Sequence, residues 1–119
     1  MKPKRSVRLA EEILKELALI LMEKIGDPRL RSVTFTQVVM TDDLKTAKVY
    51  YSVLGEVEKK KEAQVGLAAA KGFIKREIAM RMSLRYVPEL LFFYDESIEV
   101  GSKIERILQK IDDGRKQES

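Results

Sequence analysis

Residues 46–54 alternate apolar and polar side chains with a period of two, which constrains this chain more than any other feature. The apolar members share one face: Ala47, Val49, Tyr51 and Val53. A period of two is that of a strand with one buried face. A second β-branched and aromatic run covers residues 32–40, and Asp42 and Asp43 lie in the turn-forming segment between the two runs. The pattern predicts an antiparallel β-hairpin.

Apolar residues at helical spacing lie on both sides of this hairpin. They predict a first helix from about residue 6 to 25, ended by Gly26 and Pro28. A second pattern, from about 58 to 82, contains Gly66 and Gly72, each of which costs about 1 kcal/mol relative to alanine inside a helix. We therefore predict a break or kink in this helix near Ala70-Lys71-Gly72.

The remaining pattern completes an α+β domain. Residues 90–94 are short, apolar and aromatic and predict a buried strand, and residues 83–88 before them form a loop limited by Pro88. A last helix is expected to bury Ile98, Ile104, Ile107, Leu108 and Ile111. The predicted order is α-β-β-α(kinked)-β-α, with helices on one face of a three-stranded sheet. We divide the chain into a basic tail (1–5), one domain (6–111) and a polar tail (112–119).

The composition argues against an enzyme. The chain has no Cys and no His, which excludes disulfides, thiol catalysis and imidazole chemistry. Asp42 and Asp43 could bind Mg²⁺, but a turn explains them better. We expect no catalytic residue, metal or cofactor. No apolar run reaches the roughly 20 residues that span a bilayer, so we expect a cytoplasmic protein.

The positive charge is concentrated in one segment. The net charge is +4, and residues 71–86 account for all of it. This segment contains one acidic residue, Glu77, and five basic residues: Lys71, Lys75, Arg76, Arg81 and Arg85. Solvated helices usually mix charge signs, so this segment indicates a polyanionic partner, although a merely soluble face is the alternative.

Three further features suggest contacts with nucleic acid. A helix beginning near Ala70-Lys71-Gly72 would offer free backbone N–H groups to a phosphate. Arg29 and Arg31 could bind phosphates or cap the first helix. Five aromatic residues could stack on bases, although core packing is favoured: Tyr50, Tyr51, Phe92, Phe93 and Tyr94.

The predicted order resembles the type II KH domain, an RNA-recognition module. Its usual Gly-x-x-Gly loop is absent, and Ala70-Lys71-Gly72 stands in its place, as in the ribosome-binding factor A family. Other matching stretches are collinear: Asp27-Pro28-Arg29-Leu30, Asp43-Leu44-Lys45, Ala47-Lys48-Val49-Tyr50, Ser52-Val53-Leu54-Gly55, Arg85-Tyr86-Val87-Pro88-Glu89-Leu90 and Asp95-Glu96-Ser97-Ile98. The resemblance covers about residues 5–111.

The resemblance implies a non-enzymatic, monomeric assembly factor. Such a protein binds free or immature small (30S) ribosomal subunits, assists late maturation of the 16S ribosomal RNA and is important in the cold. The RNA-binding candidates are then Lys71, Gly72, Lys75, Arg76, Arg81, Arg85, Arg29 and Arg31. Two alternatives remain open from the residues: a basic adaptor for an acidic protein, and a DNA-binding regulator. The lack of a clear recognition helix counts against the second.

Overall fold

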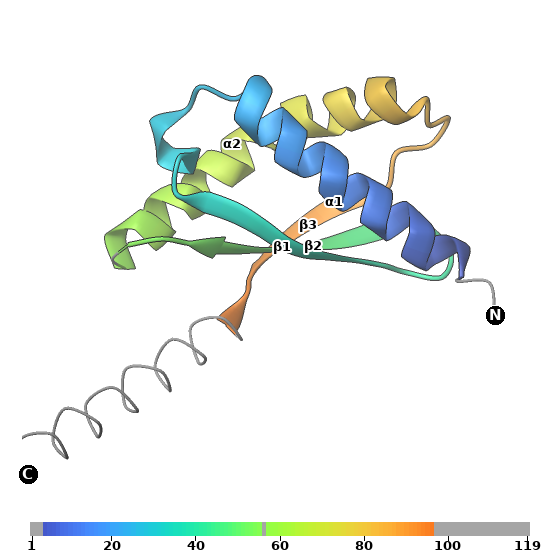
Figure 1. Cartoon of the computed structure of the whole chain (residues 1–119), viewed down its shortest axis with the longest axis horizontal. Coiled ribbons are helices and arrows are strands. Elements are labelled where there is room, and N and C mark those ends of the chain that lie inside the picture. Colours follow the sequence, from blue (N-terminus) through green and yellow to red (C-terminus); the bar gives the residue numbers. More distant parts are fainter. Residues whose placement is uncertain (1–3, 56, 97–119) are drawn as a thin grey trace, which may run out of the picture.

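The computed structural model describes residues 4–55 and 57–96 (Figure 1). In this part of the chain the elements are α1 (Arg5–Glu23), a 3₁₀ turn η1 (Pro28–Leu30), β1 (Val33–Met40), β2 (Thr46–Val53), α2 (Val57–Met82) and β3 (Glu89–Tyr94). The expected helix containing Ile98 to Ile111 lies outside the described residues, as does the tail from residue 112.

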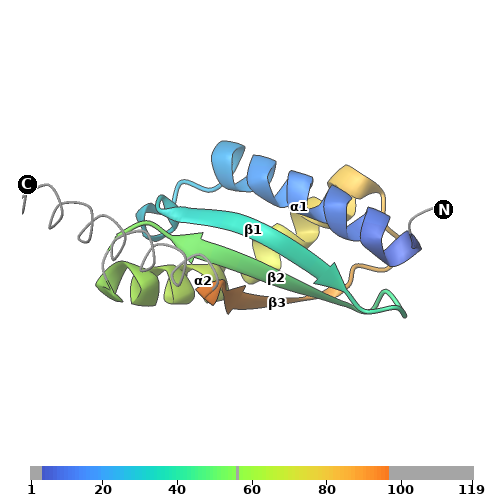
Figure 2. The ribbon, with the colours of Figure 1, turned by 60° about the horizontal axis from the view of Figure 1, so that its bottom comes forward.

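The strands form one mixed sheet in the order β1-β2-β3, side by side in Figure 2. β1 and β2 are antiparallel, from Val33 opposite Val53 to Met40 opposite Ala47, and a bulge between Phe35 and Gln37 shifts the register. β2 and β3 are parallel, from Thr46 beside Glu89 to Tyr51 beside Tyr94. The hairpin and the third strand are thus confirmed.

Asp43 holds the hairpin turn. Its Oδ1 accepts hydrogen bonds from the Thr41 hydroxyl at 2.6 Å and the Lys45 backbone N–H at 3.0 Å. The Thr41 hydroxyl bond, followed by that backbone bond, lowers the pKa of the Asp43 carboxyl. The carboxylate therefore has a structural task in the turn, as the sequence pattern favoured.

Both helices cover the same face of the sheet (Figure 1), which confirms the predicted two-layer arrangement. The core contains residues from all elements: Ala10, Ile13, Leu17, Ile20, Leu30, Val33, Phe35, Val38, Met40, Ala47, Val49, Tyr51, Ala63, Leu67, Ile74, Ile78 and Leu90. On the opposite face, Val39 and Phe93 remain 41% and 42% exposed. The sheet therefore buries one face only.

The predicted break at Ala70-Lys71-Gly72 is wrong, because α2 runs uninterrupted from Val57 to Met82. A methyl group added at Gly72 would meet only Nη1 of Arg76, at 3.6 Å, which is ordinary contact. The helix has no new N-terminus here, so the expected phosphate site on free backbone N–H groups does not exist. The prediction relied on the low helix propensity of glycine, but the packing of core side chains on both sides of Gly72 outweighs it.

Gly66, and not Gly72, is the glycine that the packing requires. A Cβ at position 66 would lie 2.9 Å from Cδ2 of Leu30 and 3.2 Å from Cβ of Arg29. Leu30 is 2% exposed, so its side chain has no free space into which it can retreat. Gly66 thus allows η1 to lie directly against α2.

We predict that Gly66→Ala destabilises the protein although alanine favours a helix. Overpacking against Leu30 costs about 1–3 kcal/mol, against a gain in helix propensity of at most about 1 kcal/mol. Gly72→Ala is the matched control, and it should raise the free energy of unfolding by up to about 1 kcal/mol. Urea denaturation of both variants measures this. Equal effects of the two substitutions would contradict the packing assigned to Gly66.

Candidate nucleic-acid interface

A groove of about 270 Å³ lies between α2 and β3, at one edge of the sheet. Eight residues line it: Tyr51, Gln64, Leu67, Ala68, Lys71, Leu91, Phe92 and Phe93. Lys71 is the one charged residue among these eight and is half-buried. The groove therefore combines apolar and aromatic walls with a single positive charge, which suits an anion that bears a flat apolar group.

Two more cations extend this surface along α2. Lys75 follows Lys71 by four positions and therefore lies on the same helix stripe, together with Gln64 and Ala68. Arg76 lies on the neighbouring stripe beside Gly72. Lys75 and Arg76 are exposed, and no acidic residue within 4–55 or 57–96 forms an ion pair with Lys71, Lys75 or Arg76. Their charges are available to a ligand.

Arg81 has a different environment, although it belongs to the same basic segment. Its guanidinium contacts Glu16 and Glu23 of α1 at 3.3 Å each, and Glu77 of α2 at 3.4 Å. Burial opposes its charge, but the hydrogen bonds to Glu23, Glu16 and Glu77 outweigh burial and raise the pKa of Arg81. Arg81 thus ties α2 to α1, and we leave it out of the proposed interface.

Arg29 is likewise paired. Its guanidinium donates to both carboxylate oxygens of Asp27, at 2.6 Å from Nη2 and 3.0 Å from Nε, and its backbone N–H donates to the same carboxylate. The side-chain bond from Arg29 is the main reason that the pKa of Asp27 is lowered. Arg31 is exposed in the same region. Arg29 packs against Gly66 of α2, and Arg31 lies beside α1 and β1; neither arginine lines the groove at β3.

Arg85 lies in the loop after α2. It is exposed, and its guanidinium carbon is 5.6 Å from the centre of the Tyr86 ring.

The structure thus separates the eight candidate RNA-binding residues predicted from the sequence. Lys71 lines the groove, Lys75 shares its stripe of α2, and Gly72 and Arg76 lie on the neighbouring stripe. Arg85 lies beyond the end of α2. Arg29 and Arg81 are paired with carboxylates, and Arg31 lies beside α1 and β1.

Comparisons with known proteins agree with this fold. Residues 5–108 match the profile of the family described as Ribosome-binding factor A. The chain belongs to the ribosome-binding factor A family. A relative from Desulfatibacillum aliphaticivorans with that name is 51% identical over 107 residues, which covers 90% of this chain and 87% of the relative.

Solved structures of the family have the same fold. The crystal structure of ribosome-binding factor A from Thermus thermophilus is 26% identical, with a TM-score of 0.66 over 75% of this chain and 93% of that chain. A Thermus thermophilus homology model fitted into a cryo-EM map of its complex with the 30S subunit is 25% identical. It has a TM-score of 0.65 and covers 76% of this chain and 96% of that chain.

The aromatic residues divide between the two faces of the sheet in this family member. Phe92 contacts Phe35 at 6.2 Å between ring centres, and Tyr94 contacts Tyr51 at 5.9 Å, on the face that the helices cover. Tyr50 and Phe93 pair at 5.7 Å on the open face. Core packing is thus right for the first set, but Phe93 is exposed and lines the groove. Side chains alternate between the two faces along 90–94, and this alternation could have placed Phe93 on the face of the sheet away from Leu90.

The described residues hold no group of three acidic, His or Cys side chains that could bind a metal ion. No helix among them is long and apolar enough to cross a bilayer.

We predict that Arg81→Gln lowers the melting temperature without changing RNA affinity. The substitution leaves Glu16, Glu23 and Glu77 close together without the cation that joins them. Arg85→Gln is the control, because Arg85 is exposed and should leave the melting temperature within a few degrees. Differential scanning fluorimetry and filter binding measure the two effects. A large loss of RNA affinity in folded Arg81→Gln would return Arg81 to the interface.

Asp27→Asn should make the stability less dependent on pH in acid. The pKa of Asp27 is lowered in the folded state, so its carboxylate stabilises the fold above the unfolded value of about 3.9. This contribution is lost as the pH falls through the lower folded pKa. Melting temperatures of the two proteins should therefore differ at pH 5–7, and the difference should shrink as the pH falls below about 3.9. A constant difference over this range would contradict the pairing with Arg29.

Proposed function

We propose that this protein binds RNA of the small ribosomal subunit through the groove between α2 and β3 and the adjacent α2 surface. The observation that carries this proposal is that Lys71 lines an apolar groove and is followed on α2 by Lys75 and Arg76. None of the three forms an ion pair within the described residues. The membership in the ribosome-binding factor A family and the 30S complex of the Thermus relative support this choice of partner.

Each part of the surface has a separate task in this proposal. Lys71 and Lys75, one helical turn apart, neutralise neighbouring phosphates, and Arg76 donates to a phosphate from the next stripe. Phe93, which is 42% exposed, offers a ring on which an unpaired base can stack. Arg85 extends the basic surface beyond α2. Phosphate contacts supply affinity, and the groove favours a strand whose bases are accessible.

Membership in the family supports a cellular role for this protein. The protein acts in the cytoplasm as a monomeric, non-enzymatic assembly factor, with residues 6–111 as its RNA-binding domain. It binds free or immature small subunits, assists late maturation of the 16S ribosomal RNA and is important in the cold. A relative named for ribosome binding, 51% identical over 107 residues, supports this role.

Reversing the three free charges tests the proposal. Lys71→Glu, Lys75→Glu and Arg76→Glu together should weaken binding to small-subunit RNA at least tenfold and leave the melting temperature almost unchanged. Each phosphate contact that is lost should make the log–log salt slope shallower by about 0.7–0.9. Filter binding at several salt concentrations measures both quantities.

Lys59→Glu with Lys61→Glu is the matched control, because both residues are exposed in the first turns of the same helix. This variant should keep nearly all RNA affinity. In sucrose gradients, the wild-type protein should migrate with free small subunits and the triple variant should not. The control reverses two charges and the test variant three, so an equal loss of affinity per reversed charge would show that binding follows total charge and does not use the groove.

A further inference from the structure

β1 is an edge strand, and it lacks most of the features that prevent such strands from pairing with other chains. Its sequence, Val33–Met40, contains no charged residue, no Pro and no Gly, and only β2 pairs with it among the described strands. Exposed edges are usually protected by charges, prolines or very short strands. The one protective feature here is the bulge between Phe35 and Gln37, which leaves a straight run from Gln37 to Met40.

The backbone of this run turns hydrogen-bonding groups outward. The backbone N–H of Thr41 donates to the carbonyl of Thr46 at 3.0 Å, so these residues form a bonded pair. Residue pairs that exchange backbone hydrogen bonds alternate along an antiparallel ladder with pairs that do not. Val38 and Met40, opposite Val49 and Ala47, therefore direct their N–H and C=O groups away from β2. No described residue outside the ladder bonds to them.

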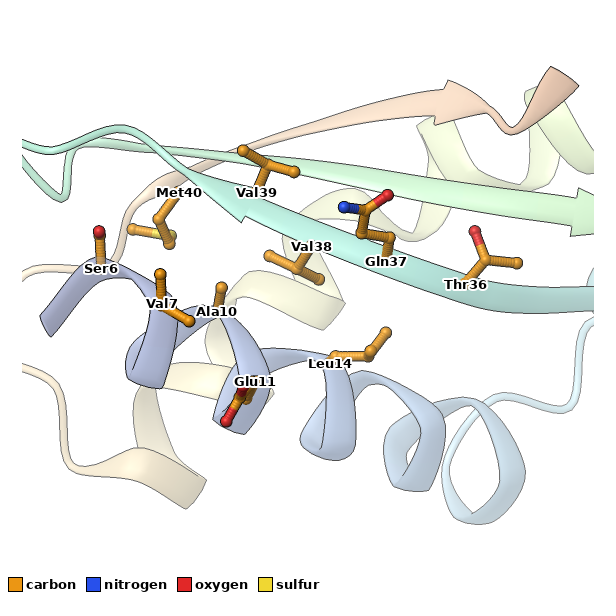
Figure 3. Close-up of a pocket in the computed structure, with 10 residues that line it drawn as sticks. All are labelled: Ser6, Val7, Ala10, Glu11, Leu14, Thr36, Gln37, Val38, Val39 and Met40. Carbon is orange, nitrogen blue, oxygen red and sulfur yellow. The ribbon is translucent and has the colours of Figure 1, made fainter. Parts of the chain in front are cut away.

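A groove runs along this edge, between β1 and α1 (Figure 3). It holds about 360 Å³ and is lined by Ser6, Val7, Ala10, Glu11, Leu14, Thr36, Gln37, Val38, Val39 and Met40. Figure 3 shows Val38 of β1 and Leu14 of α1 extending into the space between strand and helix. Val7 remains 46% exposed at one end. The edge thus offers a backbone ladder beside an apolar channel.

We propose that this edge binds an extended peptide of a protein partner, which pairs with Gln37–Met40 as a fourth strand. Its alternate side chains are apolar and enter the channel, and a lysine or arginine faces Glu11. The ladder supplies affinity, and the channel supplies specificity. The site lies at the opposite edge of the sheet from the RNA groove, so the proposal goes beyond the function proposed above.

The charge of the groove favours this occupant over two others. Glu11 is the one charged residue among the ten that line it, and a carboxylate repels the phosphates of RNA. In a dimer joined through two β1 strands, the second strand brings no cation to Glu11, because β1 has no charged residue. A peptide with a basic residue satisfies both the ladder and the carboxylate.

The test uses the full ¹⁵N-labelled chain and a synthetic peptide of alternating valine and threonine with a lysine at either end. We expect saturable binding, shifts of the β1 amide signals and at least tenfold slower hydrogen exchange at Val38 and Met40. A peptide with N-methylated backbone amides along one edge should not bind. The Lys71, Lys75 and Arg76 triple variant should bind the peptide like wild type, which separates this site from the RNA groove.

Charge reversal provides the matched pair of variants. Glu11→Lys should weaken the lysine peptide about two- to fivefold, as expected for an exposed ion pair, and should strengthen a peptide with glutamates in place of the lysines. Glu12→Lys, exposed and outside the groove lining, should change neither affinity. The proposal is overturned by equal effects of the two variants, by an absence of saturable binding, or by shifts confined to α2 and β3. Self-association through β1, or the same β1 shifts on adding small-subunit RNA, would also overturn it.

Discussion

The parallel pairing of β3 with β2 is the constraint on which the rest of the structure depends. Parallel neighbours cannot be joined by a tight turn, so the chain must cross back over the sheet before β3 can begin. α2 makes this crossing on the face where α1 also lies (Figure 1). Its 26 residues span about 39 Å, which exceeds the roughly 27 Å of an eight-residue strand. One helix therefore forms a wall of the groove at β3 and reaches α1 through Arg81.

The two edges of the sheet have different chemical characters as a result. At β3, α2 brings Lys71 beside aromatic side chains, and no acidic residue is among those that line the groove. At β1, α1 brings apolar side chains and a carboxylate beside an uncharged strand. A three-stranded sheet with one covered face is small, but it presents two grooves of different charge, one lined by Lys71 and the other by Glu11. The central strand β2, with Ala47 and Val49 fully buried, keeps these grooves apart.

The sequence predicts the elements well because their patterns are local. The predicted helix at 58–82 and strand at 90–94 differ by one residue each from α2 and β3. The functions of single residues depend on contacts across the fold, and these are not visible in local patterns. Arg81 and Lys75 look alike in the sequence, but Arg81 meets Glu16 from 65 positions away. Gly66 and Gly72 look alike as well, and only the position of Leu30 distinguishes them.

The register of the sheet also implies an order of assembly. Met40 and Ala47 are neighbours in the hairpin, whereas Thr46 must find Glu89, which lies 43 positions further along the chain. Closing a long loop costs more entropy than closing a short one, and distant contacts form more slowly. The hairpin can thus form early, and β3 joins last. The groove that holds Lys71 exists only after β3 has paired with β2, so partly folded molecules lack the surface proposed to bind RNA.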